Sequence, residues 1–161
     1  MNTVQAKRMD VMPKVARKPE AVQEIKDRIL EEALALILEY GLNSFSMRKL
    51  ARRLGMAAAN IYNYYANKDE LYLAIQTQGF ALLYERFLKV CEMQVQPLQK
   101  LRSMMREYLL FGMEHADYYD IMFNRNTPKY ADYVGTEIEP AALYEKETAL
   151  QVSELTTRII M

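Results

Sequence analysis

The sequence predicts an all-α fold. Apolar residues recur every three or four positions through most of the 161 residues, which is the period of an amphipathic helix. Hydrophobic residues make up 51% of the chain and only 5 residues are glycine, as in helix-rich globular proteins. Turn signals divide the periodic stretches. They predict a polar arm over residues 1–20, a helical unit over 21–67 and a second helical unit over 68–161.

Charge is distributed unevenly between these parts. The 21 basic and 21 acidic residues give a formal net charge of zero. Residues 1–68 hold 12 Lys and Arg against 7 Asp and Glu, whereas residues 69–161 hold 9 against 14. A basic first part followed by an acidic remainder is typical of a two-part protein whose first unit binds nucleic acid.

Composition argues against several other classes. No apolar run reaches the roughly 18 residues of a membrane span, and the first 20 residues lack the apolar core of a signal peptide. The single cysteine, Cys91, is interpreted as a small buried hydrophobe and suits a reducing cytoplasm. The single histidine, His115, has no clustered ligand partners, so we expect no metal site, no cofactor and no catalytic residues.

The first two segments differ in pattern. Residues 1–20 are basic and contain Pro13 and Pro19, a composition that predicts a flexible arm. This arm either reaches DNA or has no role. Residues 21–41 predict an amphipathic helix that Gly41 ends. Its apolar face comprises Val22, Ile25, Ile29, Ala33, Leu36, Ile37 and Tyr40.

The stretch 46–65 predicts two short helices that meet at Gly55. Ser46 can cap the first helix, and Asn67 can cap the next long one, with an acidic residue at its third position. The first helix is basic, and small Ala51 allows the second helix to cross closely. This arrangement is a helix-turn-helix, the unit that places a short helix in the DNA major groove. A helical hairpin in an unrelated all-α protein is the alternative interpretation.

An ordered set of residues in this stretch resembles the DNA-binding segment of the TetR family of transcriptional regulators. The resemblance runs from about Ile25 to Ile75 without a gap. The positions that carry it are Ser46, Met47, Arg48, Leu50, Ala51, Gly55, Ile61-Tyr62-Asn63-Tyr64-Tyr65, Asn67, Lys68, Asp69 and Leu71. The chain departs from the family pattern in the recognition helix, where Ala57, Ala58 and Ala59 replace residues that are often polar.

The resemblance and the residue chemistry together predict a DNA-binding surface. Arg48 can pair with guanine and Asn63 with adenine, while Asn60 is a further polar reader. Ala58 and Ala59 can meet a thymine methyl group or let the backbone approach closely. Phosphate contacts, which position the protein without specifying sequence, are expected from Ser46, Tyr62, Tyr64 and Lys68.

Residues 68–123 predict two long helices and a short one. The first covers 68–93, and Gly79 within it suggests a close helix crossing. The second begins at Pro97 and carries a stripe of Leu98, Leu101, Met105, Tyr108 and Gly112. Asp117 is expected to cap a short helix, and the run His-x-Asp-Tyr-Tyr-x-x-Met-Phe resembles the family segment at the same place.

Methionine and aromatic residues are dense in this region. They predict either a Met-rich core or a cavity for an apolar or aromatic ligand, since family members hold inducers there. The candidate ligand-binding residues are Leu83, Phe87, Met104, Tyr108, Phe111, Tyr119, Met122 and Phe123.

Residues 124–135 predict a loop, and Thr136 with Glu139 fits a capping box before a final helix. The apolar residues of that helix are Tyr144, Thr148, Val152, Leu155 and Ile159, with no stop signal after them. Chains of this family usually continue with one or two helices that form a four-helix dimer interface. We expect this chain to lack part of that dimer interface, through truncation or an unusual terminus.

The expected function is that of a TetR-like repressor. It would bind a palindromic double-stranded operator as a homodimer and respond to a small apolar or aromatic ligand, in the cytoplasm and without a membrane partner. Two alternatives remain. One is an orphan regulator without an inducer, and the other is a helical protein-interaction module that has lost sequence-specific DNA binding.

Overall fold

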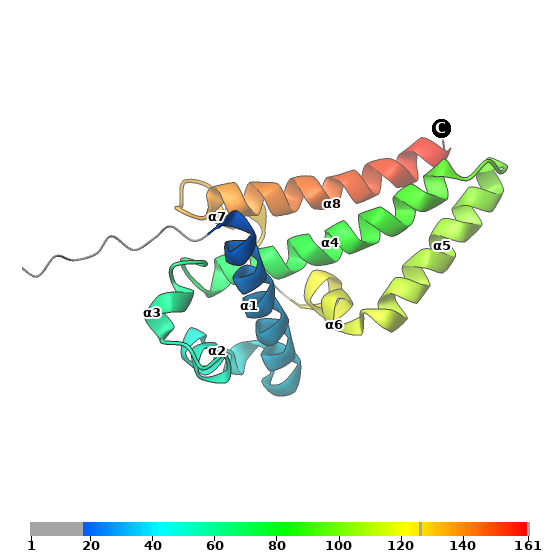
Figure 1. Ribbon diagram of the computed structural model, residues 1–161. Coiled ribbons are helices and arrows are strands. Elements are labelled where there is room, and N and C mark those ends of the chain that lie inside the picture. The colour runs from blue at the N-terminus through cyan, green and yellow to red at the C-terminus, as the bar shows by residue number, and fades with distance from the viewer. Residues whose placement is uncertain (1–17, 126, 161) are drawn as a thin grey trace, which may run out of the picture.

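The computed structural model describes residues 18–125 and 127–160, and all its regular elements in those ranges are helical (Figure 1). The N-terminal unit contains α1 (Pro19–Tyr40), the 3-10 turn η1 (Leu42–Ser44), α2 (Met47–Arg53) and α3 (Ala58–Ile61). The remainder contains α4 (Lys68–Glu92), α5 (Pro97–Glu114), α6 (Ala116–Tyr119), the π-helical turn η2 (Asp120–Asn124), α7 (Tyr130–Tyr133) and α8 (Glu139–Ile160). The all-α prediction is confirmed.

Helix α4 is the axis of the molecule. It starts beside the α1–α3 unit and extends away from it, and α8 lies along it in the same direction (Figure 1). Helix α5 returns from the far end of α4 toward α6, and α6 with η2 packs against α4 close to α1. Because α4 contacts both α1 and α8, it connects the N-terminal unit to the rest of the chain.

Local signals correctly predicted two helix boundaries in the first half, the end of α1 and the start of α4. Gly41 ends α1 with φ +79° and donates its N–H to the carbonyl oxygen of Ile37 at 2.8 Å. The Asn67 side chain accepts the N–H groups of Asp69 and Glu70, both at 2.9 Å, and so caps α4. The first helix starts earlier than predicted, since Pro19 occupies its first turn and residues 19 and 20 are helical. The predicted arm otherwise lies outside the described residues.

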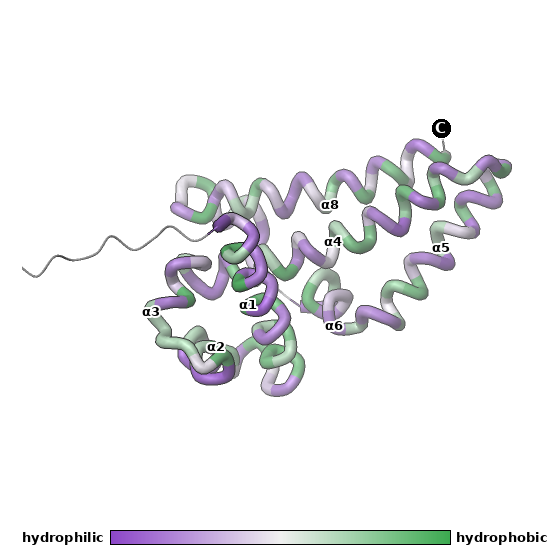
Figure 2. Tube along the Cα trace, viewed as in Figure 1, coloured by the Kyte–Doolittle hydropathy of each residue, from purple (hydrophilic) through white to green (hydrophobic). Residues whose placement is uncertain are grey.

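The larger of two hydrophobic clusters runs through both halves of the protein. Its fully buried side chains include Ile29 and Ile37 of α1, Ile61 of α3, and Leu71 and Ile75 of α4. The same cluster continues to Phe111 and Ile121 and ends at α8. Apolar and polar residues alternate along α1, α4 and α8 in step with the helical turns (Figure 2). The boundary proposed at residues 67 and 68 therefore crosses one continuous core and stays a prediction.

Gly79 marks the closest approach of α4 to its neighbours. A Cβ atom at this position would overlap Sδ of Met122 and would stand 3.1 Å from Cδ1 of Tyr118. One turn earlier, the buried Gln76 side chain donates to the carbonyl oxygen of Ile121 at 3.3 Å and to Oγ1 of Thr127 at 3.1 Å. The predicted close crossing is thus present, and it holds α6 and η2 against α4.

Three local predictions in the second half were wrong. Residues 124–135 are not all loop, because α7 forms within them and Tyr133 packs in a small second core beside Leu73. Asp117 does not cap α6: His115 is the N-cap residue, and the Asp117 carboxylate accepts the neighbouring N–H of Tyr118. Before α8, the Thr136 hydroxyl donates to the carbonyl oxygen of Tyr133 instead of capping.

The last helix does keep part of its predicted start. The Glu139 carboxylate reaches back, as in a capping box, but to the N–H of Gly135 at 2.7 Å and to the Tyr130 hydroxyl at 3.3 Å. Helix α8 therefore begins at Glu139 and is tied to α7. Thr148, Val152, Leu155 and Ile159 are buried as predicted, whereas Tyr144 is 63% exposed.

The apolar stripe predicted on α5 is only partly covered. Of its members, Leu101, Tyr108 and Gly112 are half-buried, whereas Leu98 and Met105 are 61% and 62% exposed. The periodicity indicated an amphipathic helix correctly. It could not indicate which side of that helix the rest of the chain would cover.

Two further findings concern membrane-spanning helices and the cysteine. Within the described ranges, no helix is long and apolar enough to cross a membrane. Cys91 is half-buried on α4, with its Sγ 3.8 Å from the carbonyl oxygen of Leu155 on α8.

Candidate nucleic-acid interface and ligand cavity

Helix α2 is the first of the two helices of the helix-turn-helix. The Ser46 hydroxyl oxygen accepts the Lys49 N–H at 3.3 Å and caps the helix, as predicted. Met47, Leu50 and Ala51 are buried against α1 and α3, while Arg48, Lys49, Arg52 and Arg53 are exposed. One face of α2 therefore belongs to the core and the other carries four cations.

The turn between the two helices depends on Gly55. Its φ of +64° lies in the left-handed region that favours glycine, as the sequence predicted. The Met56 N–H then bonds the carbonyl oxygen of Ala51 at 2.9 Å and closes the turn. This geometry sets the direction in which α3 leaves α2.

Helix α3 contains only four residues and is held by its apolar side. Ile61 is fully buried and Tyr65, just after the helix, is 5% exposed. Ala58 and Tyr64 are half-buried and pack against the same core. On the outer side, Ala59, Asn60 and Tyr62 are exposed. Asn63, just after the helix, is exposed as well. A short helix whose apolar side is buried and whose outer side presents amide side chains is typical of a recognition helix.

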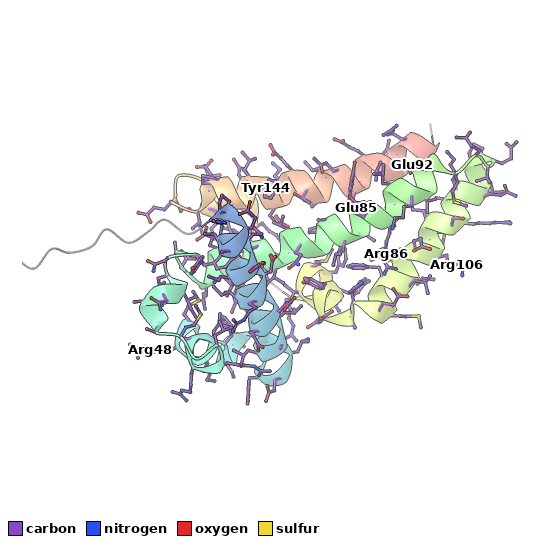
Figure 3. The ribbon with its side chains drawn as sticks, in the orientation of Figure 1. Arg48, Glu85, Arg86, Glu92, Arg106 and Tyr144 are labelled. Carbon is purple, nitrogen blue, oxygen red and sulfur yellow. The ribbon has the colours of Figure 1, made fainter. Side chains whose placement is uncertain are left out.

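The structure gathers most of the predicted DNA-contacting residues on one unit. Arg48 projects from the outer edge of that unit, away from the rest of the protein (Figure 3). Lys68 is exposed at the first turn of α4, which begins just after the recognition segment. Ser46 is half-buried with its oxygen used as a cap acceptor, so only its O–H remains to donate to a phosphate.

Two of the four cations on α2 are held by the protein itself. Arg53 donates from Nε to Glu32 at 2.7 Å and from Nη1 to Glu39 at 2.6 Å, so it pins α2 to α1. The bonds with Glu39 and then Glu32 raise the pKa of the arginine. Lys49 donates to the carbonyl oxygen of Ser44 at 2.7 Å and its Nζ lies 5.5 Å from the centre of the Tyr40 ring.

A cavity of about 230 Å³ lies between α4, α5 and α8. Its lining is almost wholly apolar, and polar side-chain atoms come only from one hydroxyl on α5 and one on α8. The residues that line it are Phe87, Leu101, Met104, Met105, Tyr108, Leu109 and Thr156. None of these lining side chains is charged, so the cavity suits an apolar or aromatic molecule.

The predicted ligand-binding residues fall into three groups in the structure. Phe87, Met104 and Tyr108 line the cavity. Leu83, Phe111 and Met122 are buried in the core, and Met122 packs against Gly79 instead of the cavity. Tyr119 and Phe123 join Phe80 and Tyr108 in an aromatic cluster beside it.

Tyr108 links the cavity to that aromatic cluster. Its hydroxyl oxygen is 3.1 Å from the Tyr119 hydroxyl oxygen, a hydrogen-bond distance. Burial, followed by this hydrogen bond, raises the pKa of Tyr108 to about 12. The phenol is therefore neutral at physiological pH and can orient a ligand by donating or accepting.

A family model matches the α1–α4 region of the chain. Residues 29–75 match the family model "Bacterial regulatory proteins, tetR family". Residues 29–75 thus form a domain of the TetR family.

Several known regulators are similar to parts of the chain. The HTH-type transcriptional regulator Rv1816 of Mycobacterium tuberculosis H37Rv is 28% identical over 68 residues, which is 42% of this chain and 29% of that protein. An uncharacterised HTH-type transcriptional regulator of Haemophilus influenzae is 40% identical over 52 residues, or 32% of this chain and 28% of that protein. The matched part of the chain thus spans less than a third of the length of these relatives.

The fold is shared over a longer range. The crystal structure of the TetR-family regulator PfmR from Thermus thermophilus matches with a TM-score of 0.66 and 25% identity. The match covers 83% of this chain and 69% of PfmR. The similarity therefore extends beyond the helix-turn-helix into the helices that enclose the cavity.

Within this domain, the sequence did not single out one candidate DNA-contacting residue, Arg52. It is exposed, and across residues 18–125 and 127–160 neither it nor Arg48 forms an ion pair or hydrogen bond with another side chain. Residues four apart on a helix lie on the same side, so Arg52 extends the surface that Arg48 begins. That spacing was visible in the sequence. It did not distinguish Arg52 from Arg53, which is bound to α1.

The same described ranges contain no cluster of three His, Cys, Asp or Glu side chains placed to hold a metal ion. His115 lies at the end of α5 with its ring centre 5.3 Å from that of Phe111 and 6.2 Å from that of Tyr118. The His115 ring therefore packs among aromatic side chains.

Proposed function

We propose that this chain is a ligand-responsive repressor that binds a palindromic double-stranded operator as a dimer. The observation that carries the proposal is the α2–α3 surface, where Arg48, Arg52 and exposed amides surround a short helix with a buried apolar back. On this surface Arg48 and Asn63 read bases, with Asn60 as a further reader. Phosphates are contacted by Lys68, Tyr62, Tyr64 and the Ser46 hydroxyl, and Arg52 is added to these contacts.

The alanine-rich start of α3 fits this assignment. Ala59 is exposed and Ala58 half-buried, so the backbone of α3 can approach the groove closely while a methyl group meets thymine. Specific hydrogen bonds then come from the flanking positions, Arg48 before the helix and Asn60 and Asn63 at its end. Arg48 and Arg52 are exposed, and among residues 18–125 and 127–160 neither has an acidic partner, which supports DNA binding over a module that has lost it.

Selection of bound DNA from a random pool tests the proposal and yields the operator. On that operator, Arg48→Ala or Asn63→Ala is expected to cost about 1–3 kcal/mol and to relax selectivity at one base step. Lys68→Ala should weaken specific and random DNA equally and should lower the salt slope by about 0.9. Lys89→Ala is the matched control, since it removes an exposed cation near the C-terminal end of α4, and it should change neither affinity nor selectivity. Recovery of no enriched sequence would contradict the proposal, and a uniform loss for Arg48→Ala would reassign that residue to phosphate.

The ligand part of the proposal rests on the cavity between α4, α5 and α8. A molecule that fills it contacts α4, and α4 carries the N-terminal unit. A ligand that binds the DNA-free arrangement better must weaken DNA binding, because the coupling between two sites is reciprocal. The orphan-regulator alternative is favoured instead if the cavity accepts no ligand.

Titration of the operator complex with apolar and aromatic compounds tests this part. We expect some of them to release DNA from the native protein, and Tyr108→Ala to blunt that release while leaving ligand-free operator affinity nearly unchanged. Tyr144→Ala is the control, because this tyrosine is 63% exposed on α8 and lies outside the cavity. Equal release from native protein and the Tyr108 variant would remove the cavity from the mechanism.

A further inference from the structure

A second cleft, of about 470 Å³, lies between α1, α4 and α8. It is separate from the cavity between α4, α5 and α8, because no described residue lines both. Helix α1 crosses α4 beside the start of α8, and the cleft lies among these three helices (Figure 1). Its volume is in the range of sites that hold small molecules. We call it the α1–α8 cleft.

One part of the lining of the α1–α8 cleft is apolar and made mostly of small side chains. Ala74 and Ala81 of α4 and Ala141 of α8 line it, together with Leu30 of α1. The three alanines leave free the space that longer side chains would occupy. This part of the cleft can therefore accept the hydrocarbon portion of a ligand.

The polar part of the lining carries more negative than positive charge. Asp27 of α1 and Glu70 of α4 supply two carboxylates, and Lys26 is the single cation among the described residues that line the cleft. Asp27 accepts a hydrogen bond from Nε2 of Gln23, and Glu70 accepts the N–H of Ala66. Both donors are neutral, and neither carboxylate forms an ion pair within residues 18–125 and 127–160. The cleft therefore attracts a positively charged group.

Two neutral groups line the cleft beside these carboxylates. Burial, followed by the negative charges of Asp27 and Glu70, raises the pKa of Tyr65, so this phenol is neutral at physiological pH. The Oε1 atom of Gln78 is buried and has no hydrogen-bond partner among the described residues. A buried acceptor without a donor costs free energy. A rotation of the Gln78 side chain toward the cleft would let an N–H group of a ligand satisfy this oxygen.

We infer that the α1–α8 cleft binds a small organic amine, whose ammonium group is held by Asp27 and Glu70 and whose apolar part lies on the alanines. The ammonium group has three N–H donors, and the two carboxylates and the Gln78 amide oxygen supply three acceptors. In the described part of the chain, no third His, Cys, Asp or Glu side chain joins these carboxylates to hold a metal ion. An organic cation is therefore favoured over a metal ion.

An amine in this cleft would touch the N-terminal unit and α8 at the same time. It would therefore resist any movement of α1 relative to α8. The inference goes beyond the proposed function and is tested in the absence of DNA. A protein that binds the amine and no operator would contradict the proposed function alone, and the reverse result would contradict this inference alone.

Isothermal titration calorimetry with phenethylamine tests the inference, with phenethyl alcohol as a neutral analogue of nearly the same shape. The native protein should bind the amine about tenfold or more tightly than the alcohol, because hydrogen bonds between charged groups are the stronger ones. Asp27→Asn keeps an acceptor for Gln23, and it should remove most of this preference without changing the affinity for the alcohol. Glu24→Gln is the matched control, since it removes an exposed carboxylate of α1 outside the cleft.

Filling the cleft provides a second variant. Ala81 is exposed on α4, so Ala81→Phe should leave the circular dichroism spectrum unchanged while its ring occupies the cleft and weakens binding of both compounds. The inference is overturned if the native protein binds neither compound, or binds amine and alcohol equally. It is also overturned if amine binding survives both Asp27→Asn and Ala81→Phe, or if Glu24→Gln lowers it as much as Asp27→Asn does. Displacement of the amine by an equimolar amount of Mg²⁺ would assign the two carboxylates to a metal ion instead.

Discussion

Replacing Gly79 with alanine is expected to lower the free energy of unfolding by about 1–3 kcal/mol, although alanine is the better helix former. The added Cβ would overlap Sδ of Met122, which is 5% exposed, and press on Tyr118, which is 8% exposed. Neither side chain can move into solvent without opening the core between α4, α6 and η2. Chemical denaturation followed by circular dichroism measures the change.

Gly112→Ala is the matched control for this prediction. Gly112 is also inside a long helix, but a Cβ there would meet Cδ2 of Tyr119 at 3.4 Å, an ordinary contact. Without a clash, the helix propensity of alanine should stabilise the protein by up to about 1 kcal/mol. The two substitutions should therefore change stability in opposite directions. If both stabilise, Met122 repacks freely and the crossing at Gly79 is not tight.

The features that could be predicted from the sequence are those set by neighbouring residues. The caps at Ser46 and Asn67 and the turn at Gly55 each depend on a few adjacent positions, so residue type was sufficient to place them. The exposed polar side of α3 followed from the same local pattern, because Ile61 and Tyr65 fix which side is buried.

The features that escaped prediction depend on contacts between distant segments. Arg53 could not be separated from Arg52 because its partners, Glu32 and Glu39, lie 21 and 14 positions away. The exposed side of α5 depends on where α4 and α8 pass, and the cavity lies where Thr156 of α8 meets residues of α5. Met122 was assigned to the cavity because methionine is common in the lining of ligand cavities. In the structure its side chain instead fills the space beside Gly79, where no Cβ atom is present.

Replacing Ile61 with alanine is expected to have the largest effect of any single truncation on the proposed DNA-binding surface. Ile61 is fully buried, and α3 is a helix of only four residues, too short to be stable without its packing. Loss of this side chain should cost about 2–5 kcal/mol of global stability, as for other buried aliphatic truncations. It should also disorder Asn60 and Asn63, which flank it, and so reduce operator affinity even in molecules that remain folded.

Ile121→Ala separates the local effect from the global one. Ile121 is also fully buried but lies on η2, away from α3, so its truncation should cost similar stability. Measured at a temperature where both variants are folded, operator affinity should fall steeply for Ile61→Ala and little for Ile121→Ala. Hydrogen exchange should show faster amide exchange over residues 58–65 in the first variant only. Equal losses of affinity would mean that DNA binding follows overall stability, and that α3 is ordered by the whole core and not by the anchor at Ile61.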